Sequence, residues 1–162
     1  MMYGIDANVF IEAAKRYYAF DLVPGFWDSL TNLVAQGRVS SIDRVNREIK
    51  EDDVREWIDK KGGFAGGFAS TDDPTVIDIY RQIMTWVNAQ AQFLPAAKSE
   101  FARGADGWLI AYAKVHGLTV VTHEVLAPAV KRKVPIPNVC LVLEVPYRDT
   151  FQMLRVLGIS FR

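Results

Sequence analysis

The sequence predicts an α/β fold, a three-layer α/β/α domain with a central parallel sheet. Short apolar runs alternate with helical patterns along the chain, which is typical of parallel α/β sheets. Residues 118–121 are too few and too apolar for anything but a strand that is covered on both faces. Acidic residues follow such runs, and in open α/β sheets ligands bind beyond the carboxyl ends of the strands.

The composition is that of one folded domain, residues 1–162, long enough to bury a full core. Because 19 basic residues balance 19 acidic ones, binding to nucleic acid would need a local basic patch. The single cysteine, Cys140, excludes an internal disulfide and fits the reducing cytosol. No apolar stretch approaches the ~20 residues of a transmembrane helix, and the N-terminus lacks the basic start of a signal peptide. We therefore expect a cytoplasmic protein without membrane association.

The chain opens with a predicted strand over residues 2–5, followed by helices over 9–18 and 24–36. Asp6 falls where the strand should end, and Asn8 follows two residues later. Buried carboxylates are rare unless they are paired or bind metal. The alternative is that Asp6 only caps the helix that begins near Asn8.

A second strand over residues 38–41 leads into a helix with an apolar stripe of Ile42, Val45 and Ile49. Glu48 lies on the flank of this stripe and can face inward at the rim of the sheet. Alternatively, it is an ordinary glutamate on a helix surface. The helical pattern continues over residues 53–61.

Residues 62–71, GGFAGGFAST, are too rich in glycine for a helix and too long for a tight turn. They are interpreted as a surface loop or, alternatively, as a mobile flap over a site. Asp73 and Pro74 then begin a long amphipathic helix, and Pro95 begins a short one.

Residues 104–124 carry the clearest pattern. Asp106 lies at a helix start, where exposed N–H groups and the helix dipole favour a negative charge. Gly117 suits the left-handed turn that ends this helix. Thr122 and Glu124 lie just beyond the strand that follows, so that Asp106 and Glu124 can meet near one edge of the sheet.

The remaining chain contains a basic group and two more elements. Lys131, Arg132 and Lys133 form a candidate phosphate-binding patch for RNA, with a solvated loop as the alternative. Residues 139–145 are predicted to be a strand in which Cys140 is a buried structural thiol. Thr150 is predicted to cap the last helix.

Four carboxylates are thus predicted to converge: Asp6, Glu48, Asp106 and Glu124. Without a cation they would repel one another, and some would stay protonated. Oxygen ligands without paired His or Cys favour Mg²⁺ or Mn²⁺ over Zn²⁺. Such ions activate water and neutralise charge on a phosphodiester, so these four residues are the predicted catalytic and metal-binding set. Asn8 and Thr122 are placed to orient the carboxylates or metal-bound waters.

Two histidines remain outside this set. His116, next to a glycine, is expected at the surface. His123 is a candidate substrate contact, because histidine titrates near neutrality.

Four motifs resemble, in order and spacing, those of PIN-domain nucleases and more closely those of VapC-type toxins: IDANVFIE at 5–12, SIDRVNRE at 41–48, ADGWLIAYA at 105–113 and VVTHE at 120–124. No single motif is diagnostic, but together they span roughly residues 2–145. The resemblance implies a PIN-like domain that is a metal-dependent endoribonuclease, often a homodimer, and usually neutralised by a partner antitoxin.

By position, Asp6, Glu48 and Asp106 match the invariant acids of this family. Glu124 matches its fourth acidic position, where Asp is more usual. The longer side chain of Glu124 leaves open whether it touches the ion directly or through water.

The leading hypothesis is therefore the toxin of a bacterial toxin–antitoxin pair, which hydrolyses RNA with metal-activated water. Its expected partners are an RNA substrate, a protein antitoxin and a second copy of itself. The alternative is a non-catalytic PIN-like module that binds RNA or protein. A haloacid dehalogenase-type phosphatase needs a second Asp where Asn8 stands. A receiver domain needs a phosphorylatable Asp at the end of a middle strand, and none is evident. Both classes are therefore less favoured.

Overall fold

The computed structural model describes residues 2–161; Met1 and Arg162, the two ends of the predicted domain, lie outside the described residues. Its centre is a parallel sheet with the strand order β3-β2-β1-β4-β5. The strands are β1 (Tyr3–Ile5), β2 (Val39–Ile42), β3 (Phe68–Ala69), β4 (Thr119–Val121) and β5 (Tyr147–Arg148). The predicted parallel α/β architecture is confirmed.

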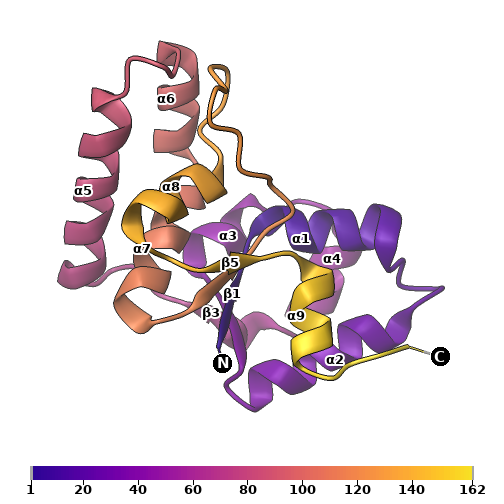
Figure 1. The fold of residues 1–162 in the computed structure, drawn as a ribbon. Coiled ribbons are helices and arrows are strands. Elements are labelled where there is room, and N and C mark those ends of the chain that lie inside the picture. Colours follow the sequence, from indigo (N-terminus) through magenta and orange to yellow (C-terminus); the bar gives the residue numbers. More distant parts are fainter. Residues whose placement is uncertain (1, 162) are drawn as a thin grey trace.

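Helices cover both faces of the sheet (Figure 1). They are α1 (Ala7–Glu12), which continues as the π-helical turn η1 (Ala13–Tyr17), α2 (Pro24–Ala35), α3 (Asp43–Glu48), α4 (Asp52–Asp59), α5 (Pro74–Ala89), α6 (Pro95–Arg103), α7 (Asp106–His116), α8 (Ile136–Leu143) and α9 (Thr150–Val156). Helices α5 to α8 gather on one side, and α1, α2, α4 and α9 on the other (Figure 1). None of the helices in residues 2–161 combines the length and apolarity needed to cross a bilayer.

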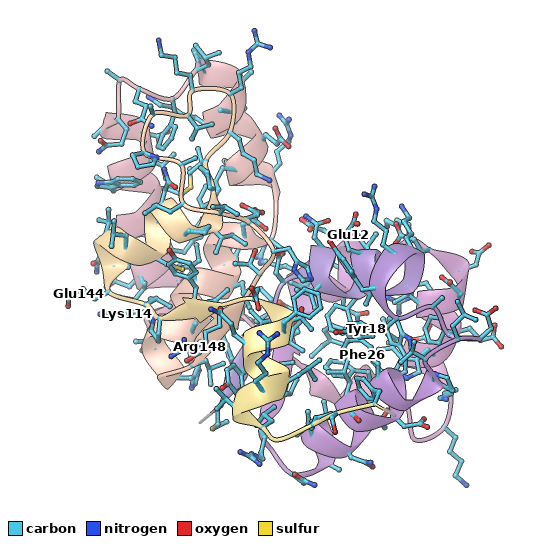
Figure 2. All side chains as sticks on the ribbon, turned by 45° about the vertical axis from the view of Figure 1, so that its right-hand side comes forward. Glu12, Tyr18, Phe26, Lys114, Glu144 and Arg148 are labelled. Carbon is cyan, nitrogen blue, oxygen red and sulfur yellow. The ribbon has the colours of Figure 1, made fainter. Side chains whose placement is uncertain are left out.

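Close packing holds α7 against the central strand. Gly4 has no side chain, and the space that a Cβ would take lies 3.4 Å from the side chains of Leu109 and Leu118. On the other side, aromatic rings fill the core between α1, α2 and α4. Tyr18 and Phe26 stack there with ring centroids 4.2 Å apart (Figure 2). The contact of Leu109 with Gly4 packs α7, the helix that begins at Asp106, against β1.

The glycine-rich residues 62–71 are not a plain surface loop. They contain the short 3-10 turn η2 (Ala65–Gly67) and the edge strand β3, which pairs with β2. Phe64 is fully buried, with its ring 5.2 Å from Phe10 and 5.3 Å from Trp57. The glycines allow the chain to pass close to the core, since a Cβ on Gly63 would clash with the carbonyl oxygen of Trp57.

The predicted strand over residues 139–145 is wrong. This stretch lies mostly in helix α8, with a proline in its first turn, and β5 follows at Tyr147–Arg148. Val139 and Cys140 are buried while Leu141 and Val142 are exposed, so the helix buries only one face. A short apolar run does not distinguish a strand from a half-buried helix by periodicity alone.

The cap of the last helix is also corrected. Asp149, not Thr150, caps α9 through a capping box, in which its side chain accepts from Gln152 N and Asp149 N donates to the Gln152 side chain. The predicted helix starts at Pro24, Asp73 and Pro95 hold, and the Asp73 carboxylate caps α5. The first helix instead starts at Ala7, and residues 49–51 separate α3 from α4. Gly117 adopts the predicted left-handed conformation (φ 68°).

Candidate metal site

The strand order creates a crevice at the carboxyl ends of β1 and β4. From β1 the chain builds outward to β2 and β3 on one side, whereas β4 and β5 lie on the other. Ligands bind at such switch points in open α/β sheets. Asp6 directly follows β1 and Thr122 directly follows β4, and Asp6 N donates to Val121 O over 3.0 Å.

Asp6 is only 1% exposed, and capping does not account for it. Its backbone occupies the N-cap of α1, but its side chain makes no capping hydrogen bond. Instead, its Oδ2 accepts from the hydroxyl of Thr122 over 3.1 Å. That hydroxyl also accepts from Glu124 N at 3.1 Å, so Thr122 connects two of the predicted acidic residues.

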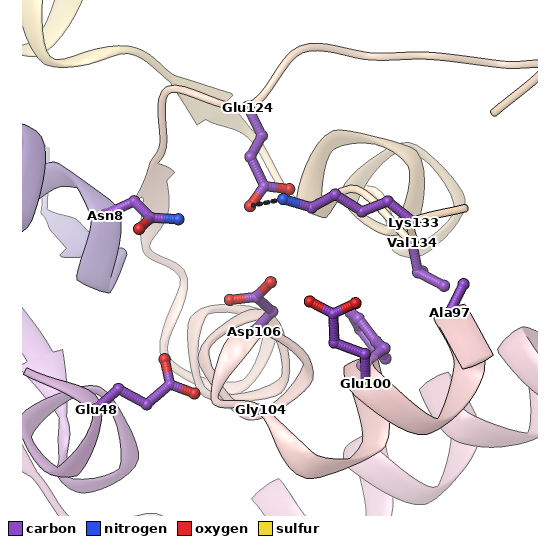
Figure 3. A pocket seen from close by; sticks show the side chains of 10 residues that line it. Asn8, Glu48, Ala97, Glu100, Gly104, Asp106, Glu124, Lys133 and Val134 are labelled. Atoms are coloured by element: carbon purple, nitrogen blue, oxygen red, sulfur yellow. Dashed lines mark ion pairs between the residues drawn. The ribbon is translucent and has the colours of Figure 1, made fainter. Parts of the chain in front are cut away.

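Asp106 lies in the first turn of α7 and points into the pocket (Figure 3). Glu48, the last residue of α3, lines the same pocket from the opposite side. Its Oε1 accepts from Ala105 N over 2.7 Å and satisfies an N–H group at the start of α7. Glu48 is exposed, as the surface alternative expects, but it also ties α3 to the helix that carries Asp106.

Glu124 is engaged by the segment that follows it. Its Oε2 lies 3.2 Å from Lys133 Nζ (Figure 3), and its Oε1 accepts from Ile136 N over 2.9 Å. Burial lowers the pKa of Lys133, but Glu124, and beyond it Asp106 and Asp6, raise it above the ordinary value. Lys133 thus carries a fixed positive charge at the pocket.

These side chains line a cavity of about 210 Å³, with Asp6 buried beside it. The lining residues are Asn8, Glu48, Ala97, Glu100, Phe101, Gly104, Asp106, Glu124, Lys133 and Val134. Three of the four predicted acids therefore meet in one cavity. Sequence reasoning missed Glu100, which comes from α6. The short connection between α6 and α7 through Gly104 is the signal that could have found it.

The pKa values show that the four acids share one electrostatic field. Burial, and then the charges of Glu124 and Glu48, raise the pKa of Asp6 to about 7, although the Thr122 hydrogen bond lowers it. Burial, and then Asp6, Glu124 and Glu48, raise the pKa of Asp106 to about 8. Both shifts follow from desolvation and like-charge repulsion, which a bound cation would relieve.

The donor chemistry fits Mg²⁺ or Mn²⁺, because the available ligands are carboxylate and amide oxygens. Within residues 2–161, however, no group of three or more His, Cys, Asp or Glu side chains is arranged to hold a metal ion as it stands. Glu48 bonds to Ala105, and Glu124 bonds to Lys133 and Ile136. An ion bound directly by Glu48 or Glu124 would have to compete with these contacts.

The other candidates lie outside the cavity. Lys131 and Arg132 are exposed on the loop before α8, and His116 is exposed beside the ring of Tyr112. His123 is half-buried near Tyr17 and Phe151, and its Nε2 lies 3.1 Å from the hydroxyl of Thr150. Burial lowers the pKa of His123.

Comparison with known structures shows that the fold of this domain is PIN-like. A chain in the crystal structure of FitAcB from Neisseria gonorrhoeae has 23% identity and a TM-score of 0.53, over 90% of this chain and 96% of that one. A chain of FitAB bound to an IR36 DNA fragment has 22% identity and a TM-score of 0.54, over 91% and 94%. A chain of VapBC2 from Rickettsia felis, bound to a DNA fragment from their promoter, has 12% identity and a TM-score of 0.55, over 92% and 98%.

The family of the chain is shown by the match of its sequence to a family model. The chain belongs to the family described as Domain of unknown function (DUF4411), whose model matches residues 3–161. No curated protein matches the chain. The solved structures therefore establish the PIN-like fold, and the chemistry has to be argued from the site itself.

Proposed function

We propose that the protein is a metal-dependent endoribonuclease and the toxin of a bacterial toxin–antitoxin pair. The observation that carries the proposal is the convergence of four carboxylates from separate parts of the chain at the β1/β4 crevice. Burial, and then their mutual repulsion, raise the pKa of both Asp6 and Asp106, which is costly unless a cation is bound. Strongly shifted carboxyl groups in a cleft are typical of functional sites.

In this proposal Asp6 and Asp106 hold the ion, with Glu48 and Glu124 completing the acidic set directly or through water. Bound Mg²⁺ or Mn²⁺ supplies charge neutralisation and an activated water for in-line attack on a phosphodiester. Thr122 orients Asp6 by its hydrogen bond, and Glu48 fixes the start of α7 beneath Asp106. Asn8 faces the cavity, where its amide can orient a water.

The substrate and partners follow from the same proposal. RNA would approach over the loop that carries Lys131 and Arg132, two exposed cations outside the cavity. The toxin assignment is supported by the likeness of the fold to chains of FitAB and VapBC2, together with the motif resemblance to VapC-type toxins. A cytoplasmic homodimer that a small antitoxin inhibits is the expected form, and light scattering would measure its mass.

The test is cleavage of bulk transfer and ribosomal RNA in Mn²⁺ or Mg²⁺. Asp6→Asn and Asp106→Asn should abolish cleavage while circular dichroism shows a folded protein. Asp28→Asn, an exposed position on α2, is the matched control and should cut at the wild-type rate. Wild-type rates in both site variants would end the nuclease proposal.

A second candidate function is a non-catalytic PIN-like module that binds RNA or protein. The ion pair between Lys133 and Glu124 favours it, because an ammonium group already compensates part of the negative charge. Calorimetry separates the two candidates. A nuclease should bind Mn²⁺ at neutral pH, whereas a scaffold whose charges are balanced internally should not.

A further inference from the structure

Glu124 is held by both carboxylate oxygens, and both contacts come from one short segment. Lys133 approaches Oε2 at 3.2 Å and Ile136 N donates to Oε1 at 2.9 Å. The Glu124 side chain is only 12% exposed. An aspartate is one methylene shorter, so it would not span the same distance from this backbone position. The glutamate at this position is therefore explained by contacts with the chain rather than by contact with an ion.

The segment that carries Lys133 is anchored on both sides. Before it, Lys131 O accepts from Leu94 N over 2.9 Å, and after it Val134 is 2% exposed. The side chain of Lys133 extends from this anchored backbone toward Glu124, and in the view of Figure 3 its end lies above Asp106. The Lys133 side chain remains 49% exposed and lines the cavity, so a ligand that enters the cavity can contact it.

The cavity carries an excess of negative charge, which Lys133 partly compensates. Of its lining residues, Glu48, Glu100, Asp106 and Glu124 are acidic and Lys133 is basic. A phosphodiester is negatively charged and is repelled by such a surface even after a divalent ion has bound. A lysine ammonium has three donors and binds phosphate as a point charge, so it can keep its bond to Glu124 while it donates to a phosphate oxygen.

We propose that Lys133 is a catalytic residue that binds a non-bridging oxygen of the scissile phosphate, and that Glu124 is the positioning residue that aims it rather than a ligand of the ion. This inference rests on the proposed ribonuclease function and assigns a role within that site. A preorganised cation beside the phosphate stabilises the charge that develops in the transition state. The ammonium group of Lys133, held in place by Glu124, therefore supplies a positive charge at the cavity in addition to that of the ion.

The test combines RNA cleavage with Mn²⁺ calorimetry, using bulk transfer RNA as the probe. Lys133→Met should lower kcat at least about tenfold, as expected for the loss of one charged transition-state contact. It should bind Mn²⁺ at least as tightly as wild type, because a competing cation is gone. Lys133→Arg should restore part of the rate. Lys114→Met, an exposed position on α7 (Figure 2), is the matched control and should leave kcat and Mn²⁺ affinity unchanged.

Glu124→Gln separates positioning from metal binding. It should lower kcat as Lys133→Met does. The double variant should be no slower than either single variant, because each change disrupts the same Lys133–Glu124 pair. It should also keep its Mn²⁺ affinity within about threefold of wild type. Asp106→Asn should lose at least about tenfold, because changing a residue that only orients a metal ligand already costs about 10–100-fold.

The outcomes distinguish failure of this inference from failure of the proposed function. If Glu124→Gln weakens Mn²⁺ binding as much as Asp106→Asn, Glu124 is a ligand and the assignment is wrong. If Lys133→Met cuts RNA at the rate of Lys114→Met, the catalytic role of Lys133 is wrong although the nuclease proposal stands. If the wild-type protein neither binds Mn²⁺ nor cuts RNA, the proposed function and this inference fall together.

Discussion

Thr122 donates a hydrogen bond to Oδ2 of Asp6 over 3.1 Å, although the two residues are 116 positions apart in the chain. The parallel register of β1 and β4 places Ile5 opposite Val121, so the residues that directly follow the two strands lie side by side. The sheet, rather than any local segment, therefore brings this pair together. The effect of losing this hydrogen bond should be measurable without unfolding the protein.

Thr122→Val removes the hydroxyl and keeps the shape of the side chain. The hydrogen bond lowers the pKa of Asp6, so without it that pKa should rise further and protons should compete more strongly with a metal ion. We expect Mn²⁺ affinity to fall by about tenfold, the lower end of the effect of orienting residues. Calorimetry should find a larger deficit at pH 6.5 than at pH 8.5, and Thr122→Ser should behave as wild type. Equal affinities for Thr122→Val and wild type at both pH values would contradict this role.

The metal-free protein should lose stability as pH rises. The pKa of Asp106 is raised from 3.8 to about 8 by burial and by its acidic neighbours, so the folded state binds a proton that the unfolded state releases. The favourable contribution is complete below pH 3.8 and is lost as pH rises through about 8. Because each pKa unit corresponds to about 1.4 kcal/mol, the loss should be on the order of 2 kcal/mol or more.

Urea unfolding in EDTA at pH 5 and pH 8.5 measures this effect. The fall in the free energy of unfolding between these pH values should be smaller in Asp106→Asn than in wild type, and unchanged in Asp28→Asn. Adding Mn²⁺ at pH 8.5 should restore stability to the wild-type protein, since a ligand of the folded state alone stabilises it. A pH dependence identical in Asp106→Asn and wild type would mean that Asp106 does not titrate as described.

Much of the fold could be predicted from local signals. Pro24, Asp73 with Pro74, and Pro95 begin helices as the sequence indicates, and Asp106 and Gly117 bound α7. These predictions hold because capping and proline effects depend on a few neighbouring residues. Residues 139–145 lie mostly in α8 and not in the predicted strand. Whether such an apolar run is a strand or a helix depends on what covers it, which is a property of the whole fold.

The site was predictable only in part for a related reason. The order of acidic residues after strands and at helix starts indicated where carboxylates meet, because parallel strands end at one edge. The contacts of Glu124 with Lys133 and Ile136, and the approach of Glu100 from α6, depend on side-chain directions in loops and tertiary packing. The sequence also suggested that Lys133 belongs to a surface patch with Lys131 and Arg132. The ion pair with Glu124 instead directs Lys133 into the acidic cavity.

Cys140 should be inert in the folded protein. Its side chain is fully buried in α8, and burial followed by the charge of Glu124 raises the pKa of its thiol to about 12. Because the thiolate is the reactive form, Ellman's reagent should not modify it at pH 8 until the protein unfolds. Release of one equivalent of chromophore on adding urea is the positive control. Rapid reaction without denaturant would contradict the packing of α8.

The glycine-rich segment gives the sharpest test of the corrected fold. A Cβ on Gly63 would clash with the carbonyl oxygens of Trp57 and Ile58, which are backbone atoms of α4 that cannot move aside cheaply. A Cβ on Gly66 would meet nothing within 4 Å. Gly63→Ala should therefore destabilise the protein by about 1–3 kcal/mol, the usual cost of overpacking, whereas Gly66→Ala should be neutral or slightly stabilising.

Chemical denaturation of the two variants beside wild type measures the difference. If residues 62–71 were the mobile flap or plain loop that their composition indicates, both alanines would have the same small effect, since an unpacked chain has room for a methyl group. A deficit confined to Gly63→Ala would instead follow from the tight passage of the chain beside α4, which brings Phe64 into the core and β3 to the edge of β2.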